Sequence, residues 1–484
     1  MKQHKISYTF WWKALPVIAL AVWGALCVSP NLWYDEAYSA ALVSRSWFDM
    51  IYITALDAHS PFYYGMLKLF AYLGGHTHFQ ILKLMSLLFM MGYLLLGKYY
   101  VKKLFGEKVS VYFQFFSVTM PIMAVQAGNV RMYAAALFFM TLAGLTACDL
   151  FQNPEQERRK WKWFVFWGAG VCTVCCHTFA MIQMVWIYVL FLAAILLKKK
   201  YQLIKPYFIA GFGVALTFSP WLVVTFLQMR LRMANDVAPG QSEATPTIYT
   251  LIDYCKEWFS AIETPIAAVM FFGMGLTIFL GYYAVDAMRR EKRYEVGLGI
   301  GAIGLTTLTG ALVSYYATPC FLGRYAFPGF GSLALLYAVG MAEISSRKIK
   351  TVVIAAVILF FGLQYRSELE LEYDPGLAVY ETFLEEEVKS EDAFLGPYGH
   401  TLFLSVYHPQ LQYYVYGYKS NSLPFVNTEA FTDWSQLENR EGKVWYICFE
   451  GATPSEMEER YTWQEALSFR YMYYDFVIYE LIHR

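Results

Sequence analysis

Residues 14–36 read "ALPVIALAVWGALCVSPNLWYDE", and the fold follows from how this stretch is interpreted. An apolar run over residues 14–30 is followed closely by two adjacent carboxylates, Asp35 and Glu36. A helix that crosses a bilayer needs about 20 predominantly apolar residues, and no small-residue cleavage site follows the run cleanly. We therefore interpret the run as a first membrane helix with an acid pair just beyond its end.

The composition extends this interpretation to the whole chain. Of the 484 residues, 57% are hydrophobic, 19% are aromatic and 16% are charged. Soluble domains carry about 25% charged residues, so the sequence predicts an all-α, multi-pass membrane protein. We expect membrane lipids around it and no nucleic-acid partner.

Further apolar runs predict about eleven membrane helices in all. They lie near residues 14–30, 81–101, 109–126, 131–150, 163–180, 181–197, 206–224, 263–285, 296–316, 326–344 and 351–365. Basic clusters separate them: the N-terminal lysines, "KYYVKK" with Lys108, "ERRKWK", "KKK", "RREKR" and "SSRKIK". This assignment puts every cluster on one side, and the loops rich in Lys and Arg are the cytoplasmic ones. The first loop (about 31–80) and the tail (366–484) are then extracytoplasmic, on a cell membrane (plasma or inner).

The first loop contains two amphipathic segments. Ala40, Val43, Trp47, Met50 and Ile51 recur at helical spacing, which predicts a helix lying on the membrane surface with its apolar face down. The stretch "PFYYGMLKLFAYLGG" predicts a second such helix or a re-entrant one. If this stretch crossed the membrane, the basic clusters that follow it would no longer lie on the same side as the N-terminal lysines.

The tail differs from the rest in charge and pattern. Up to Tyr365 the chain has 30 Lys and Arg against 17 Asp and Glu, and after it 8 against 21. Short β-rich runs such as "KVWYICFE" and "MYYDFVIYEL" alternate there with turn residues. We predict a membrane domain over 1–365, with the first loop carrying the catalytic residues, and a small extracytoplasmic α/β domain over 366–484.

Most of the eight cysteines fall in apolar runs. "VCTVCCHTF" brings together Cys172, Cys175 and Cys176, a spacing also found in metal and redox motifs. On a hydrophobic helix without a second cysteine pair, we interpret them as small buried residues.

Ionisable residues near the extracytoplasmic ends of the spans are functional candidates, because charges close to a bilayer are costly. Each also has a simpler explanation: helix starts for the acids, headgroup anchors for the arginines, and an aromatic belt for the tyrosines. Their combination favours function, since carboxylates and lone arginines suit a hydroxyl acceptor and an anionic, lipid-linked substrate. The candidates are Asp35, Glu36, Asp57, His59, Tyr63, Arg131, Tyr133, His177, Arg324 and Tyr325.

Four stretches carry a family resemblance. "LWYDEAYS", "DAHSPFYYGMLKLFAYLGG", "VRMYAA" and "GRYAFPGF" follow one another in this order. The order resembles bacterial relatives of the protein O-mannosyltransferases, in the GT-C superfamily that includes the lipid A aminoarabinose transferases. The similarity runs from about Trp33 to Tyr325, and the first loop is its most specific part.

The resemblance implies an inverting glycosyltransferase that uses a polyprenyl-phosphate sugar donor on the extracytoplasmic face. Asp35 matches the catalytic acid and Glu36 its neighbour. Asp57 and His59 match the polar part of an Asp-x-His-Pro-Pro segment, and Arg131 with Tyr133 matches an Arg-x-Tyr motif.

Two positions depart from the family pattern. Ser60-Pro61 stands where relatives commonly have Pro-Pro, and Asn129 stands where many have an acid two residues before the arginine. Without that acid, the number of catalytic carboxylates and the need for a metal stay open. Asp57 and His59 are accordingly either a divalent-metal pair or positioning groups.

The expected reaction is a single in-line displacement. Asp35 accepts the proton of the acceptor hydroxyl, whose oxygen attacks the anomeric carbon, while Arg131 and Arg324 neutralise the lipid phosphate. The enzyme is then a hexosyl- or pentosyltransferase of the cell envelope, for example in protein glycosylation, with a protein, lipid or glycan acceptor. Three alternatives are a polymerase or ligase of lipid-linked glycans, a secondary transporter and a non-catalytic scaffold or sensor.

Overall fold

The computed structural model describes residues 8–484 except 58, 76, 154–158, 236–246, 260–266, 292–294, 318–319, 398–400, 417–424, 426 and 439. The chain forms two compact units. The helical unit comprises Met1–Val28, Asp57–Tyr63 and Lys83–Glu368, and the sheet unit comprises Ser29–Leu56, Tyr64–Leu82 and Leu369–Arg484.

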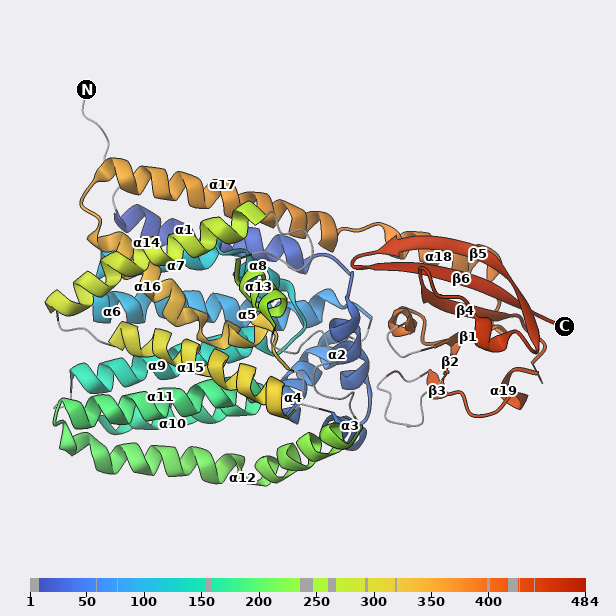
Figure 1. The fold of residues 1–484 in the computed structure, drawn as a ribbon, viewed down its shortest axis with the longest axis horizontal. Coiled ribbons are helices and arrows are strands. Elements are labelled where there is room, and N and C mark those ends of the chain that lie inside the picture. The colour runs from blue at the N-terminus through green and yellow to red at the C-terminus, as the bar shows by residue number, and fades with distance from the viewer. Residues whose placement is uncertain are drawn as a thin grey trace. The chain divides into compact units, whose positions relative to one another are not determined.

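The helical unit is a bundle of long apolar helices (Figure 1). Its helices are α1 (Tyr8–Cys27), α5 (Gln80–Leu95), α6 (Lys102–Phe105), α7 (Glu107–Thr119), α8 (Pro121–Gly128), α9 (Tyr133–Gln152), α10 (Arg159–Cys176), α11 (Thr178–Leu197), α12 (Ile204–Asn235), α13 (Ile248–Phe259), α14 (Ala267–Glu291), α15 (Glu295–Tyr316), α16 (Phe330–Glu343) and α17 (Arg347–Glu372). The π-helical turn η2 (Leu96–Val101) joins α5 to α6, and the 3₁₀ helices η3 (Tyr201–Leu203) and η4 (Gly323–Gly329) precede α12 and α16.

Within the described residues, nine helical segments are long and apolar enough to span a membrane. The pair α7 and α8, bent by 67°, makes a tenth if it counts as one span. The bend falls at Pro121, whose ring prevents a continuous helix but suits a helix start. The remaining expected span coincides with α10, an 18-residue helix whose first turn carries Arg159, Lys160 and Lys162. These charges explain why α10 falls short of the apolarity of the others.

Small residues set the helix spacing inside the bundle. A Cβ atom at Gly340 of α16 would lie 2.1 Å from the carbonyl oxygen of Leu280 in α14, so the two backbones are in direct contact. Similar approaches occur at Gly299, beside Ser332, and at Gly331, beside Thr141. Membrane helices pack in this way because small residues increase van der Waals contact where lipid provides no hydrophobic drive.

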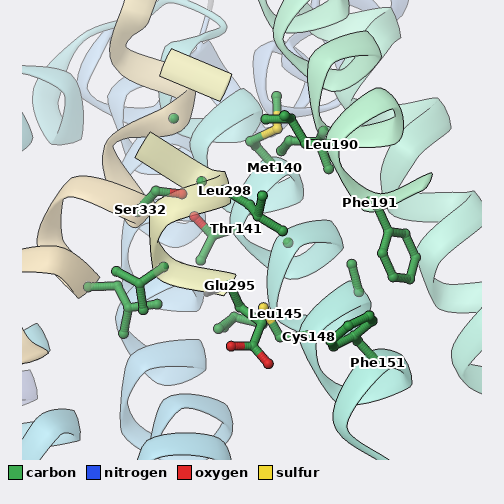
Figure 2. Close-up of a pocket in the computed structure, with 18 of the residues that line it drawn as sticks. Met140, Thr141, Leu145, Cys148, Phe151, Leu190, Phe191, Glu295, Leu298 and Ser332 are labelled. Carbon is green, nitrogen blue, oxygen red and sulfur yellow. The ribbon is translucent and has the colours of Figure 1, made fainter. Parts of the chain in front are cut away.

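The packing leaves a pocket between α9, α11, α15 and α16, and its empty space, including the part open to solvent, measures about 820 Å³. Figure 2 shows side chains from these helices facing one another across it, with Thr141 and Ser332 near one another and Glu295 beside Cys148. Two of the close glycine contacts, at Gly299 and Gly331, lie in the wall of this pocket.

The sheet unit contains a six-stranded sheet in the order β3-β2-β1-β4-β6-β5. The strands are β1 (Ala393–Gly396), β2 (Gln412–Val415), β3 (Thr428–Ala430), β4 (Val444–Phe449), β5 (Tyr461–Tyr471) and β6 (Tyr474–His483). The first four pair in parallel, and β4, β6 and β5 pair antiparallel. The unit also contains the short helices α19 (Ser435–Glu438), η6 (Phe403–Tyr407) and η7 (Ser455–Met457).

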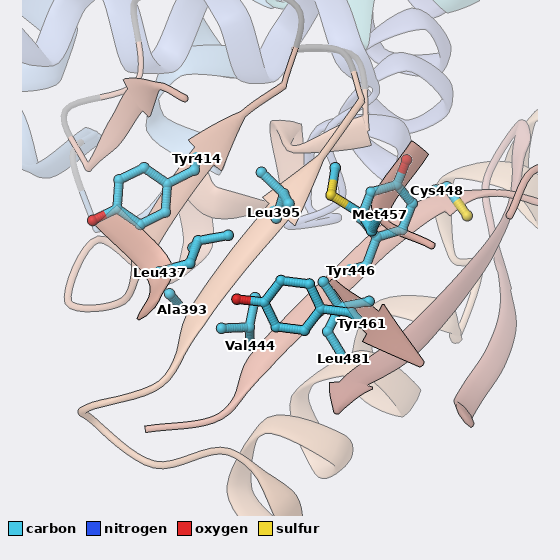
Figure 3. Packing of buried hydrophobic residues seen from close by; sticks show 10 residues of the cluster. All are labelled: Ala393, Leu395, Tyr414, Leu437, Val444, Tyr446, Cys448, Met457, Tyr461 and Leu481. Carbon is cyan, nitrogen blue, oxygen red and sulfur yellow. The ribbon is translucent and has the colours of Figure 1, made fainter. Parts of the chain in front are cut away.

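Both faces of this sheet are covered, because side chains alternate along each strand. One face carries the cluster in Figure 3, which includes Leu395, Tyr446 and Met457. On the other face, α18 (Gly376–Glu387) packs Phe383 against Trp445, with ring centroids 5.2 Å apart. The prediction of an all-α membrane part with a small α/β domain is confirmed.

The first loop is helical, as expected, but it contains a break. It forms α2 (Tyr34–Ser44), α3 (Trp47–Leu56) and α4 (Pro61–Phe70), and α4 is followed by the π-helical turn η1 (Ala71–Gly75). The single helix expected across residues 40–51 is wrong, because Ser46 starts a new one: its hydroxyl accepts the Asp49 N–H at 3.1 Å. The expected apolar face is correspondingly divided, with Ala40, Val43 and Met50 buried but Trp47 and Ile51 exposed.

We predict that Gly340→Ala lowers the thermal unfolding midpoint in detergent, because the added methyl group meets a backbone oxygen that cannot rotate away. Overpacking of this kind costs about 1–3 kcal/mol. Gly275→Ala on α14 is the matched control, since a Cβ there meets nothing within 4 Å. Equal midpoints for the two variants would show that α14 and α16 are not in backbone contact.

Candidate functional site

Several candidate residues of the helical unit meet where helices begin. Arg131 lies two residues before Tyr133, the first residue of α9, and His177 caps the start of α11. The imidazole ring of His177 lies 5.5 Å from the rings of both His59 and Tyr133 and 4.9 Å from that of Tyr325 in η4. We call His59, Arg131, Tyr133, His177 and Tyr325 the imidazole cluster. It joins four segments that are distant in sequence.

Hydrogen bonds orient both imidazoles in this cluster. The Nη2 atom of Arg131 lies 3.1 Å from the Nε2 atom of His59. Because a guanidinium group can only donate hydrogen bonds, His59 Nε2 is the acceptor. His177 Nδ1 accepts the backbone N–H of Phe179 at 3.1 Å, so a neutral His177 carries its proton on Nε2. The arginine and the His177 N–H therefore both supply donors, as an anionic ligand requires.

A second arginine belongs to the same region. Arg324 and Arg131 both lie close enough to His177 to act on it electrostatically. The Arg324 backbone N–H donates to Glu257 Oε2 on α13 at 2.6 Å. Because Tyr254 of α13 also stacks on Phe321, with centroids 4.3 Å apart, α13 holds the segment that carries Arg324 and Tyr325.

Gly323 allows this close approach. A Cβ atom at this position would lie 2.3 Å from the Tyr254 carbonyl oxygen and 2.8 Å from the Glu257 Cβ. The glycine in "GRYAFPGF" is thus needed for contact with α13, because any side chain there would push the two segments apart.

Asn129 shapes the turn that presents Arg131. Its carbonyl oxygen accepts the Ser86 hydroxyl at 2.6 Å and the Arg131 N–H at 2.8 Å, and its side chain is buried. The residue that replaces a family acid therefore contributes through its backbone to the start of α9. Of the remaining candidates in this unit, Tyr63 is fully buried in the first turn of α4 and Asp57 is half-buried between α3 and α4.

The two acids of the sheet unit have different environments. Glu36 is fully buried, and its Oε2 accepts the Trp33 N–H at 3.2 Å, closing the start of α2 as a capping carboxylate does. Asp35 is half-buried in the same first turn. Glu36 therefore has a structural role at the start of α2.

The tail anchors the segment that leads into α2. The Leu32 N–H lies 2.8 Å from the Tyr407 hydroxyl and 3.0 Å from the Tyr471 hydroxyl, and Tyr471 donates to the Leu32 carbonyl at 3.1 Å. Burial raises the pKa of both tyrosines, with their mutual contact contributing at Tyr407, so they stay protonated donors. The position of Asp35 is thus set by residues more than 300 positions further along the chain.

Sequence reasoning missed several buried charges of the helical unit, including Asp149 and Lys162, which form an ion pair at 3.0 Å. It also missed Lys83 on α5, which is fully buried, and Glu257, which is half-buried in a stretch interpreted only as a connection. The signal for Lys83 was a single cation inside the apolar run 81–101. For Glu257, it was an acid surrounded by aromatic residues in "YCKEWF".

A metal at Asp57 and His59 finds no support in this geometry. Within the described residues, no group of three or more His, Cys, Asp and Glu side chains could hold a metal ion. At His59 Nε2 a cation would face the Arg131 guanidinium, which carries a permanent positive charge. The contact with Arg131 favours positioning as the role of His59.

We predict that Glu257→Gln stabilises the protein increasingly as pH rises from about 5 to about 8. Burial raises the pKa of the Glu257 carboxyl, while Arg324 acts in the opposite direction. A carboxyl whose pKa is raised by folding stabilises the native state below its unfolded-state pKa and loses that contribution as pH rises through the folded value. Glutamine keeps an acceptor for the Arg324 N–H without this pH dependence.

The measurement is the difference between the unfolding midpoints of variant and wild type across that pH range. Glu381→Gln is the control, because Glu381 is an exposed acid on α18 and is not among the groups that act on the Glu257 carboxyl. A difference that stays constant with pH for Glu257→Gln would contradict the prediction.

Comparison with known proteins supports the fold. No family model matches the chain, and no curated protein matches it closely in sequence. ArnT from Cupriavidus metallidurans in the apo state matches at a TM-score of 0.67 and 13% identity, over 97% of this chain and 98% of ArnT. ArnT bound to undecaprenyl phosphate matches at 0.65 and 14% identity, over 98% of each chain.

A weaker match is the Archaeoglobus fulgidus oligosaccharyltransferase, at a TM-score of 0.48 and 10% identity, covering 94% of this chain and 72% of that one. The ArnT matches extend over nearly the full length of both chains. This multi-pass membrane protein therefore has the GT-C fold that the resemblance predicted.

Proposed function

We propose that the protein is an inverting glycosyltransferase that moves a sugar from a polyprenyl-phosphate donor to a hydroxyl acceptor. The observation that carries the proposal is the imidazole cluster with Arg324, where two arginines and an oriented imidazole N–H meet in one buried region. A solved protein of the same fold, ArnT, binds undecaprenyl phosphate. An isoprenoid phosphate joins an anionic head to an apolar chain, which suits a site within a bundle of membrane helices.

The reaction is a single displacement at the anomeric carbon. The acceptor oxygen forms a bond to that carbon as the bond to the phosphate oxygen breaks, and the configuration inverts. The departing polyprenyl phosphate keeps the electron pair, and its charge is neutralised by Arg131 and Arg324, whose planar guanidinium groups match phosphate oxygens. The Nε2–H of His177 provides a further donor.

Asp35 is our candidate for the base that takes the acceptor's proton. The hydrogen bond from the Trp33 N–H to Glu36 supports assigning the base to Asp35 and not to Glu36, because it uses the Glu36 carboxylate to hold the start of α2. A positioned base contributes about 10²–10⁴-fold to the rate. Asp57, His59, Tyr63, Tyr133 and Tyr325 then act as substrate-binding or positioning groups.

The basic clusters support an orientation with this chemistry on the extracytoplasmic face of the cell membrane. In that orientation the sheet unit is extracytoplasmic as well. The acceptor is a hydroxyl of a protein, a lipid or a glycan, and the sugar is a hexose or a pentose.

The test of the proposed function supplies the purified protein with labelled polyprenyl-phosphate monosaccharides and a membrane extract as the source of acceptors. Sugar transfer with inverted configuration is the expected result. If transfer required a donor that carries a glycan chain, the protein would be a polymerase or ligase. If no donor were used, the proposal would fail.

We predict that Asp35→Asn reduces transfer by about 10²-fold or more, since asparagine cannot accept the proton. Glu36→Gln is the matched neighbour: glutamine can also close a capping box, so we expect it to retain much of the activity. Both variants are compared with wild type by initial rate, after circular dichroism has shown that they fold. Equal rates for Asp35→Asn and wild type would exclude Asp35 as the base.

We also predict that Arg324→Ala weakens binding of undecaprenyl phosphate by about 10-fold or more, because hydrogen bonds to charged groups contribute about 1.5–3 kcal/mol each. Arg290→Ala is the control, since this exposed arginine pairs with Asp286 and Glu343. Binding is measured by titration in detergent. Equal affinities for the two variants would remove Arg324 from the phosphate site.

A further inference from the structure

The pocket within the helical unit is apolar along most of its wall. Of the described residues that line it, Glu295 is the one charged side chain, at the start of α15. Figure 2 shows Leu298, Leu190 and Phe191 on its walls, with the hydroxyls of Thr141 and Ser332 among them. No lining arginine, lysine or histidine is found among those residues, so the pocket suits hydrocarbon and not an anionic head.

The pocket lies further along the same helices that begin at the imidazole cluster. On α9 its wall runs from Met140 to Phe151, whereas Tyr133 marks the start of the helix. At a rise of 1.5 Å per residue, the pocket spans roughly 10 to 27 Å from that end. On α11 it runs from Ile187 to Ala194, at a similar depth below His177.

The short helix η4 connects the two places. Arg324 and Tyr325 stand near its start, and Pro328 and Gly329 at its end line the pocket. A molecule whose phosphate binds beside Arg324 thus meets the pocket wall within one short element of structure. This continuity indicates one ligand with an anionic head and an apolar chain.

The depth of the pocket determines which kind of apolar chain the ligand must have. The hydrocarbon core of a bilayer is about 30 Å thick and is shared by two leaflets, so a phospholipid acyl chain covers about 15 Å. A chain that starts at the imidazole cluster and fills a pocket extending to roughly 27 Å must be longer than that. Long isoprenoid chains meet this requirement.

We propose that this pocket holds the distal part of the donor's polyprenyl chain and makes the protein selective for long-chain over short-chain polyprenyl phosphates. The inference rests on the proposed function and adds to it the position that sets chain length. Gly144 on α9 is the residue through which it can be tested. It lines the pocket, and a Cβ atom there would meet nothing within 4 Å.

The experiment measures binding of undecaprenyl phosphate and farnesyl phosphate, without sugar, to wild type and to Gly144→Phe. Because every further CH₂ that is buried adds affinity, we expect wild type to bind undecaprenyl phosphate at least about 10-fold more tightly than farnesyl phosphate. In Gly144→Phe the ring occupies the pocket. The preference should then fall several-fold, while farnesyl phosphate binds as in wild type.

Gly304→Phe on α15 is the matched control. A Cβ atom there also meets nothing within 4 Å, and the residue is exposed and outside the pocket. It should keep the wild-type preference. An unchanged preference in Gly144→Phe, or an equal loss of affinity for both lipids, would overturn the inference. Wild type that binds both lipids equally would overturn it while leaving the proposed function standing, whereas wild type that binds neither would overturn both.

Discussion

The contact between Arg131 and His59 is the interaction on which the organisation of the helical unit's site depends. A guanidinium group cannot lose its proton at any ordinary pH, and Arg131 is only 5% exposed. Placing it at the start of α9 therefore requires partners that accept hydrogen bonds, and His59 Nε2 is one of them. The bond fixes the tautomer of His59 and ties the segment before α4 to the start of α9. The remaining positive charge is what an anionic substrate would neutralise.

The arrangement of α13, η4 and Gly323 serves the same purpose for the second arginine. Glu257 fixes the backbone at Arg324, and the Arg324 guanidinium carbon lies 6.0 Å from the centre of the Tyr325 ring. This arrangement costs burial of a carboxyl group, which is reflected in its raised pKa.

The sequence predicted the long apolar helices, because bilayer thickness imposes their length, and the basic clusters between them agreed with that assignment. It also predicted His59, Arg131, Tyr133, His177, Arg324 and Tyr325 as candidates, which the structure brings together. It could not predict the break between α2 and α3, where one serine cap outweighs a continuous apolar periodicity. It could not predict the role of Glu257 either, since that role depends on contacts with Gly323 and Arg324, more than 60 residues away. The capping role of Glu36 was missed for a similar reason: adjacent acids look alike until their hydrogen bonds are known.

The bonds from Tyr407 and Tyr471 to Leu32 bear on how the chain can be divided. Residues 29–56 follow the first membrane helix in sequence, yet they belong to the same compact unit as the C-terminal sheet. A chimera that exchanged only residues 369–484 with those of a relative would separate the two tyrosines from the backbone they hold. The exchangeable module is therefore discontinuous, and any recombination of specificities between relatives has to transfer all three of its segments together.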